Sequence, residues 1–126
     1  MATKADVIAY IRKNYRVREH EDGGLDLVFE VDDGRSHMVL VGWNDEEGTF
    51  TEFFGVVCEW SEEAAGKAVA AGADLIFGIR KQGNRVVVCD YQLTETIDEE
   101  EIDTTLRGIA HVADEIELKV TGGDEW

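Results

Sequence analysis

Three histidines are the side chains of this sequence best suited to general acid–base chemistry or metal binding: His20, His37 and His111. None stands four residues from another, and none belongs to an H-E-x-x-H motif, the spacing that puts two imidazoles on one helix face. We therefore predict no catalytic residue, no metal site and no cofactor. One alternative stays open, in which His37 or His111 acts with nearby carboxylates in a small hydrolase or metal-dependent enzyme.

Acidic clusters are frequent but have simpler explanations than cation binding. Residues 99–101 are three consecutive glutamates at an expected helix start, where the helix dipole favours negative charge. Residues 32–34 and 44–48 contain calcium-type side chains without the alternating spacing and closing glutamate of an EF-hand loop. The sequence also lacks G-x-G-x-x-G, Walker A and G-x-S-x-G motifs, so it gives no support to an enzyme.

The two cysteines are isolated. Cys58 and Cys89 each follow a β-branched run and lack the C-x-x-C spacing of metal or redox sites. We expect both to be buried, reduced thiols.

The charge balance excludes some partners. With 28 acidic and 12 basic residues, the formal charge of −16 repels phosphate backbones, so we expect no nucleic-acid partner. This acidity fits either a solubility device or salt adaptation. No run approaches the roughly 18 apolar residues of a membrane span. We therefore expect a cytoplasmic protein without a membrane partner, folded as a single domain over residues 1–126.

The first half is typical of one helix followed by an antiparallel meander. Thr3 and Asp6 can form a capping box for a helix that ends near Tyr15. The hydrophobic period then changes from about four to two, and Asp33-Gly34 supplies a hairpin turn. Gly55 indicates a bulge or a close approach of another element. The expected strands are residues 17–20, 25–31, 37–43 and 49–59.

Two helices and a hairpin are expected in the second half. Ser61 caps a helix with a narrow apolar face, formed by Ala65, Ala68, Val69 and Ala73. Strands follow at residues 75–80 and 85–93, around a short turn at 82–84. The last helix begins with Asp98 as N-cap, Glu101 at N3 and a staple between Ile97 and Ile102, and it ends at Gly122-Gly123.

These elements predict an α+β fold: an antiparallel sheet of about five strands with three helices, in the order α-β-β-β-α-β-β-α. Each helix has one apolar stripe to bury against the sheet. In the last helix this stripe consists of Leu106, Ile109, Ala113 and Ile116.

An aromatic segment is the strongest candidate for a binding surface. Its members are Trp43, Phe50, Phe53 and Phe54. Adjacent residues of a strand point to opposite faces, so Phe53 and Phe54 cannot both enter one core. The second face is covered by a helix or a dimer mate, or it forms a groove for a partner protein.

Packing and capping patterns lie at residues 61–63, 75–78, 86–88, 97–102 and 113–114, and none of them is a catalytic signature. Together with the element order, these patterns resemble the type III secretion chaperone-like superfamily, and within it the YbjN-type group described as bacterial sensory transduction regulators. The resemblance covers most of the chain.

The resemblance implies a non-catalytic, chaperone-like or regulatory homodimer that binds an extended or apolar segment of a partner protein. We expect the aromatic segment to contact that partner. Small side chains on the second helix suit close packing between subunits, so Ala65, Ala68 and Val69 are the expected dimer interface.

Overall fold

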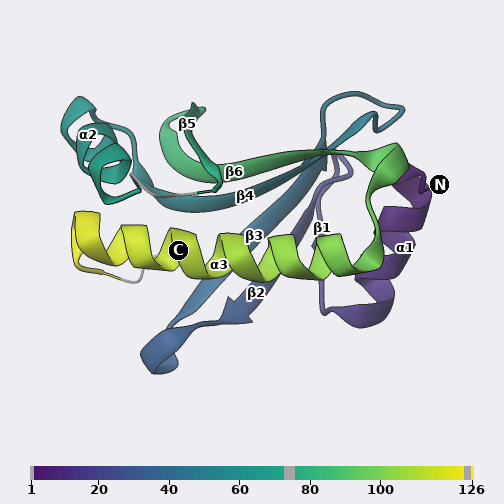
Figure 1. Ribbon diagram of the computed structural model, residues 1–126, viewed down its shortest axis with the longest axis horizontal. Helices are drawn as coiled ribbons and strands as arrows, with labels where there is room; N and C mark the ends of the chain where they lie inside the picture. Colours follow the sequence, from purple (N-terminus) through teal and green to yellow (C-terminus); the bar gives the residue numbers. More distant parts are fainter. Residues whose placement is uncertain (1, 73–75, 124–125) are drawn as a thin grey trace.

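The structure, a computed structural model, describes residues 2–72, 76–123 and 126. In these residues it has an α+β fold with three helices and one six-stranded antiparallel sheet (Figure 1). The helices are α1 (Lys4–Asn14), α2 (Glu62–Ala71) and α3 (Glu99–Thr121). The strands are β1 (Arg18–Glu19), β2 (Leu25–Glu30), β3 (Ser36–Trp43), β4 (Phe50–Glu59), β5 (Gly78–Gln82) and β6 (Arg85–Leu93).

The predicted helix boundaries are confirmed by their caps. Thr3 and Asp6 bond reciprocally at the start of α1, with the Asp6 amide donating to Thr3 Oγ1 over 3.2 Å. Asp98 and Glu101 form the same box at α3, where the Glu101 amide donates to Asp98 Oδ1 over 2.7 Å. Gly122 ends α3 in the left-handed region, with φ of 75°. Each cap satisfies backbone groups that have no partner inside the helix.

The strand order is β1-β2-β3-β4-β6-β5, with every neighbouring pair antiparallel. The order of elements agrees with the prediction, but the described sheet has six strands rather than about five. The smallest is β1, a two-residue edge strand that pairs Arg18 with Asp26 and Glu19 with Leu25. The predicted strand at residues 75–80 is observed as β5 at Gly78–Gln82, and Ala73 and Leu75 lie outside the described residues.

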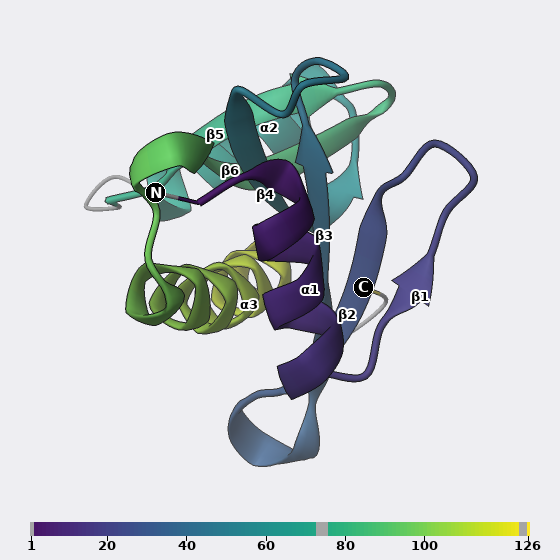
Figure 2. The ribbon, with the colours of Figure 1, turned by 90° about the vertical axis from the view of Figure 1, so that its right-hand side faces the viewer.

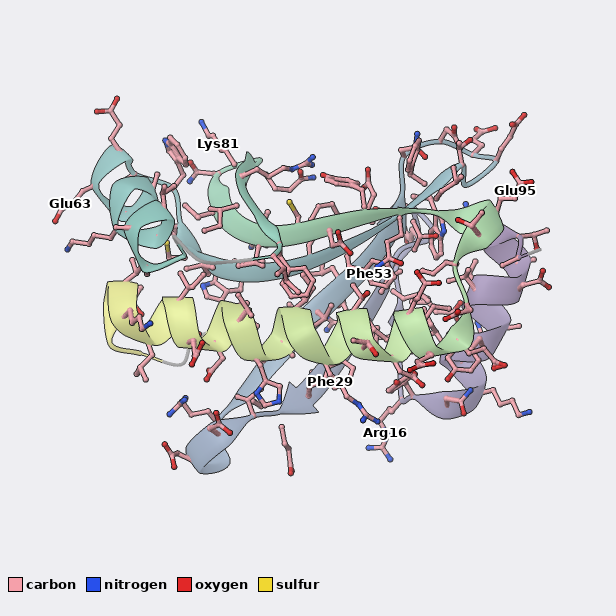
Figure 3. All side chains as sticks on the ribbon, viewed as in Figure 1. Arg16, Phe29, Phe53, Glu63, Lys81 and Glu95 are labelled. Carbon is pink, nitrogen blue, oxygen red and sulfur yellow. The ribbon has the colours of Figure 1, made fainter. Side chains whose placement is uncertain are left out.

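The helices pack against one face of the sheet, with α1 beside the N-terminal end of α3 and α2 beside its C-terminal end (Figures 1 and 2). Phe53 lies between the sheet and α3 and is fully buried (Figure 3). The predicted stripe of α3 is buried with it: Leu106, Ile109, Ala113 and Ile116. We call the opposite surface of the sheet the outer face.

The predicted close approach at Gly55 is confirmed. A Cβ atom built on Gly55 would lie 2.7 Å from the Cβ of Ala113, closer than two carbon atoms can pack. The strand register also shifts between Val56 and Cys58, which marks an irregularity next to this glycine.

No helix in the described residues is long and apolar enough to cross a bilayer.

Candidate functional site

The predicted aromatic residues are divided between the two faces of the sheet. Strand alternation puts Phe53 in the helix-side core and Phe54 on the outer face. Trp43 is half-buried on the helix side, where its Nε1 donates to Thr51 Oγ1 over 3.0 Å. Phe50 is exposed and pairs across the sheet with Leu93. The four residues therefore do not form one surface, and Phe54 with Phe50 belongs to the outer face.

An apolar cluster lies on the outer face although no described helix covers it. Phe54, Val56, Val87 and Cys89 are buried there, packed against Leu40 and Trp126. The strand register explains this grouping, because Leu40 and Cys89 are both direct cross-strand neighbours of Phe54. The cluster therefore spans β3, β4 and β6.

Trp126 binds this face with both its backbone and its side chain. Its carbonyl oxygen accepts a hydrogen bond from the Met38 amide on β3 over 3.0 Å, while its ring joins the apolar cluster. The guanidinium of Arg85 lies 4.4 Å from the centre of the Trp126 ring, within the range of a cation–π contact. The outer face thus already accommodates an aromatic residue that also bonds a strand.

Cationic side chains gather over the aromatic rings of the outer face. The Arg80 guanidinium lies 5.3 Å from the Phe54 ring centre and 5.0 Å from that of Tyr91. Burial raises the pKa of the neighbouring Glu52 carboxyl, and Arg80 opposes this shift. In a chain with a formal charge of −16, this face therefore has a local positive component.

A groove of about 500 Å³ runs along this surface. Its volume lies in the range of sites that bind small molecules or side chains of a partner. Its outer-face lining includes Leu40, Glu52, Phe54, Val56, Val87, Gln82 and Arg85, and Trp43 also borders the groove. The groove is open, so it can accept a segment of extended chain.

The second candidate site lies under the helix-side face, at the C-terminal half of α3. His37 of β3 faces two carboxylates of α3: its Nδ1 is 3.7 Å from Glu117 Oε1 and 4.0 Å from Asp114 Oδ1. Nε2 of His37 is 2.7 Å from the Val56 carbonyl oxygen. Nε and Nη2 of Arg35 each lie 2.9 Å from Asp114 Oδ2. His37, Asp114 and Glu117 are 0%, 2% and 1% exposed, so the cluster is enclosed.

Of the three histidines, His37 has the carboxylate neighbours that the enzyme alternative requires inside the fold. His111 is exposed on α3, and His20 Nε2 lies 2.6 Å from Asp26 Oδ1 at the edge of the sheet. Asp114 and Glu117 were not predicted as functional residues, and Asp114 was named only among the residues that carry the family resemblance. The sequence pattern that could have identified them is a pair of acidic residues, three positions apart, next to the apolar stripe of α3.

Two of the three predicted dimer-interface residues pack inside the subunit instead. Ala68 is fully buried and Ala65 half-buried, both packed into the helix-side core. Val69 is 59% exposed and remains accessible to another subunit.

Both cysteines are buried and free of disulfides, as predicted. Burial raises the pKa of the Cys58 thiol, with a further increase from Glu117. Burial also raises the pKa of Cys89. A raised thiol pKa disfavours the reactive thiolate, so both residues serve packing.

In the comparisons with known proteins, no family model matches this sequence and no curated protein is significantly similar to it.

Proposed function

We propose that this protein is a non-catalytic binding module, chaperone-like or regulatory, that holds an extended segment of a partner protein on its outer face. The observation that carries the proposal is the binding of Trp126 to the outer face. Its ring packs into the apolar cluster, while its carbonyl oxygen accepts a hydrogen bond from the Met38 amide. A partner segment can use the same combination of an aromatic anchor and main-chain hydrogen bonds in the adjacent groove.

The net charge of the protein and the arginines of the outer face indicate which kind of partner segment can bind. The overall charge of −16 disfavours acidic segments, whereas Arg80 and Arg85 favour aromatic rings on this face. The expected ligand is therefore an extended segment with aromatic residues and without net negative charge. The resemblance to secretion chaperones supports the same mode, and a cytoplasmic location stays a prediction.

We also propose that the protein forms a homodimer. The resemblance supports this assembly, and the exposed Val69 on α2 offers an apolar contact. Ala65 and Ala68 would act indirectly, because their small side chains let α2 lie close to α3 within each subunit.

The binding proposal is tested by selecting peptides from a displayed random library and measuring their affinity for outer-face variants. Phe50→Ala and Leu93→Ala each remove an exposed side chain from the outer face. Leu118→Ala is the matched control, because Leu118 of α3 is 41% exposed, as is Phe50. We expect the two outer-face variants to weaken binding several-fold and the control to leave it unchanged. Equal losses in all three, or a library that yields no binder, would refute the proposal.

A further inference from the structure

The ring orientation of His37 is defined by its contact with Val56. A carbonyl oxygen accepts hydrogen bonds and cannot donate them, so Nε2 at 2.7 Å carries a proton. Nδ1 then faces the carboxylates of Glu117 and Asp114. Metal-binding histidines commonly donate their second ring N–H to a backbone carbonyl in this way, which fixes the tautomer and the ring plane.

The buried carboxylate of Asp114 has one oxygen that the described residues leave without a hydrogen bond. Arg35 contacts Oδ2 of Asp114, while Oδ1 is buried and has no hydrogen-bond partner among the described residues. This oxygen faces Nδ1 of His37 at 4.0 Å. A buried carboxylate oxygen without a hydrogen bond is costly, so Oδ1 of Asp114 favours coordination to a metal ion.

We propose that His37, Asp114 and Glu117 bind a divalent first-row transition-metal ion, for which Zn²⁺ is the reference. One ligand atom from each residue lies within 4.8 Å of the other two. Tetrahedral zinc places such ligands about 3.4 Å apart, so the side chains must close by up to about 1.4 Å around the ion. One imidazole with two carboxylates suits zinc, iron or manganese, whereas calcium and magnesium prefer oxygen ligands.

The site would have a structural role rather than a catalytic one. Its ligands are at most 2% exposed, so a substrate has no route to the ion. The ion would join α3 to β3 at the point where the pairing of β3 with β4 ends, beyond Val39 and Gly55. Glu117 Oε2 also accepts from the Trp126 amide over 3.2 Å, which connects this cluster to the outer face.

Chelator-stripped wild-type protein is titrated with Co²⁺, followed by its visible absorption, and Zn²⁺ is then added as a competitor. We expect one equivalent of Co²⁺ to give ligand-field bands, which Zn²⁺ abolishes, and we expect Zn²⁺ to raise Tm because it binds the native state. Asp114→Asn and Glu117→Gln preserve side-chain size and should weaken Co²⁺ binding at least tenfold. Glu115→Gln and His111→Gln alter exposed residues of the same helix and should bind as wild type does.

The wild-type titration decides the question even where a variant does not fold. No saturable Co²⁺ bands and no change of Tm with Zn²⁺ would overturn the proposal and leave the cluster as an ion-pair network. Binding that survives in folded Asp114→Asn and Glu117→Gln, or that is lost equally in the two control variants, would overturn it as well.

Discussion

At Gly55 the sheet and α3 come closer than any larger residue would permit. An alanine Cβ there would lie 2.7 Å from the Cβ of Ala113 and 3.0 Å from Cγ2 of Ile109. Overpacking of this kind typically costs about 1–3 kcal/mol, so Gly55→Ala should lower the free energy of unfolding by that amount. Urea denaturation followed by circular dichroism measures the change.

Gly42→Ala provides the control in the neighbouring strand. A Cβ on Gly42 would meet no atom within 4 Å, and alanine is about 0.5–1 kcal/mol better than glycine inside regular secondary structure. We expect this variant to match or exceed wild-type stability. Equal effects of the two substitutions would contradict the close contact at Gly55.

Two tyrosines, one in α1 and one at its C-cap, form hydrogen bonds with the same carboxylate of α3. The hydroxyls of Tyr10 and Tyr15 both donate to Asp103, the former over 2.8 Å. The hydrogen bond to Asp103 is the main cause that raises the pKa of Tyr10 to about 12. For Tyr15 burial is the larger cause, followed by Asp103, and its pKa is also about 12.

The Asp103→Asn variant should therefore lower the pKa of Tyr10 more than that of Tyr15. Absorbance titration of phenolate in Tyr15→Phe and Tyr10→Phe backgrounds measures each group separately. Since the folded-state values exceed the unfolded value of about 10, both tyrosines contribute stability that is present below pH 10 and lost between about pH 10 and 12. A Tyr10 midpoint unchanged by Asp103→Asn would contradict this arrangement.

The start of α3 rests on its N-cap. Asp98 accepts from the Glu101 amide, and its replacement by alanine should cost about 0.5–2 kcal/mol of unfolding free energy. Glu100→Ala removes an exposed acid from the same turn without removing a cap, so its cost should be smaller. Thermal and urea unfolding of the two variants compare these effects, and a larger loss in Glu100→Ala would contradict the assigned cap.

Elements with strong local signals were predictable, and those without them were not. The caps of α1 and α3 depend on residues three positions apart, so the sequence displays them directly. By contrast β1 has two exposed residues and no alternation to read, so its strand was expected at residues 17–20 only as the opening of the meander, and the predicted number stayed at about five. The opposite orientation of Phe53 and Phe54 followed from the strand period, but their environments depended on which face the helices cover.

The His37 cluster could not be predicted from local patterns. Arg35 and Asp114 are 79 positions apart, and they meet because α3 crosses β3 with one particular face turned toward it. The rotation of a helix about its axis is set by packing of the whole molecule, whereas sequence periodicity gives only the face that is apolar.

The net charge of the subunits should control their assembly. Subunits with a formal charge of −16 repel each other, and salt screens that repulsion, so the proposed homodimer should strengthen from low to physiological ionic strength. Val69→Glu should weaken it, while Val28→Glu, at a similarly exposed valine of β2, should not. Light scattering coupled to gel filtration measures both effects. A monomer at high micromolar concentration in every salt would contradict the dimer.

The proposed function requires the outer face to bind a segment of another protein. Residue-resolved amide chemical-shift mapping with a library-selected, Trp-containing peptide tests it most directly, because it locates the bound segment without mutation. We predict the largest shifts at Leu40, Phe54 and Val87, which line the groove, with smaller changes on the exposed side of α3. Shifts concentrated on α2 and α3, with the outer-face amides unchanged, would contradict binding at the outer face.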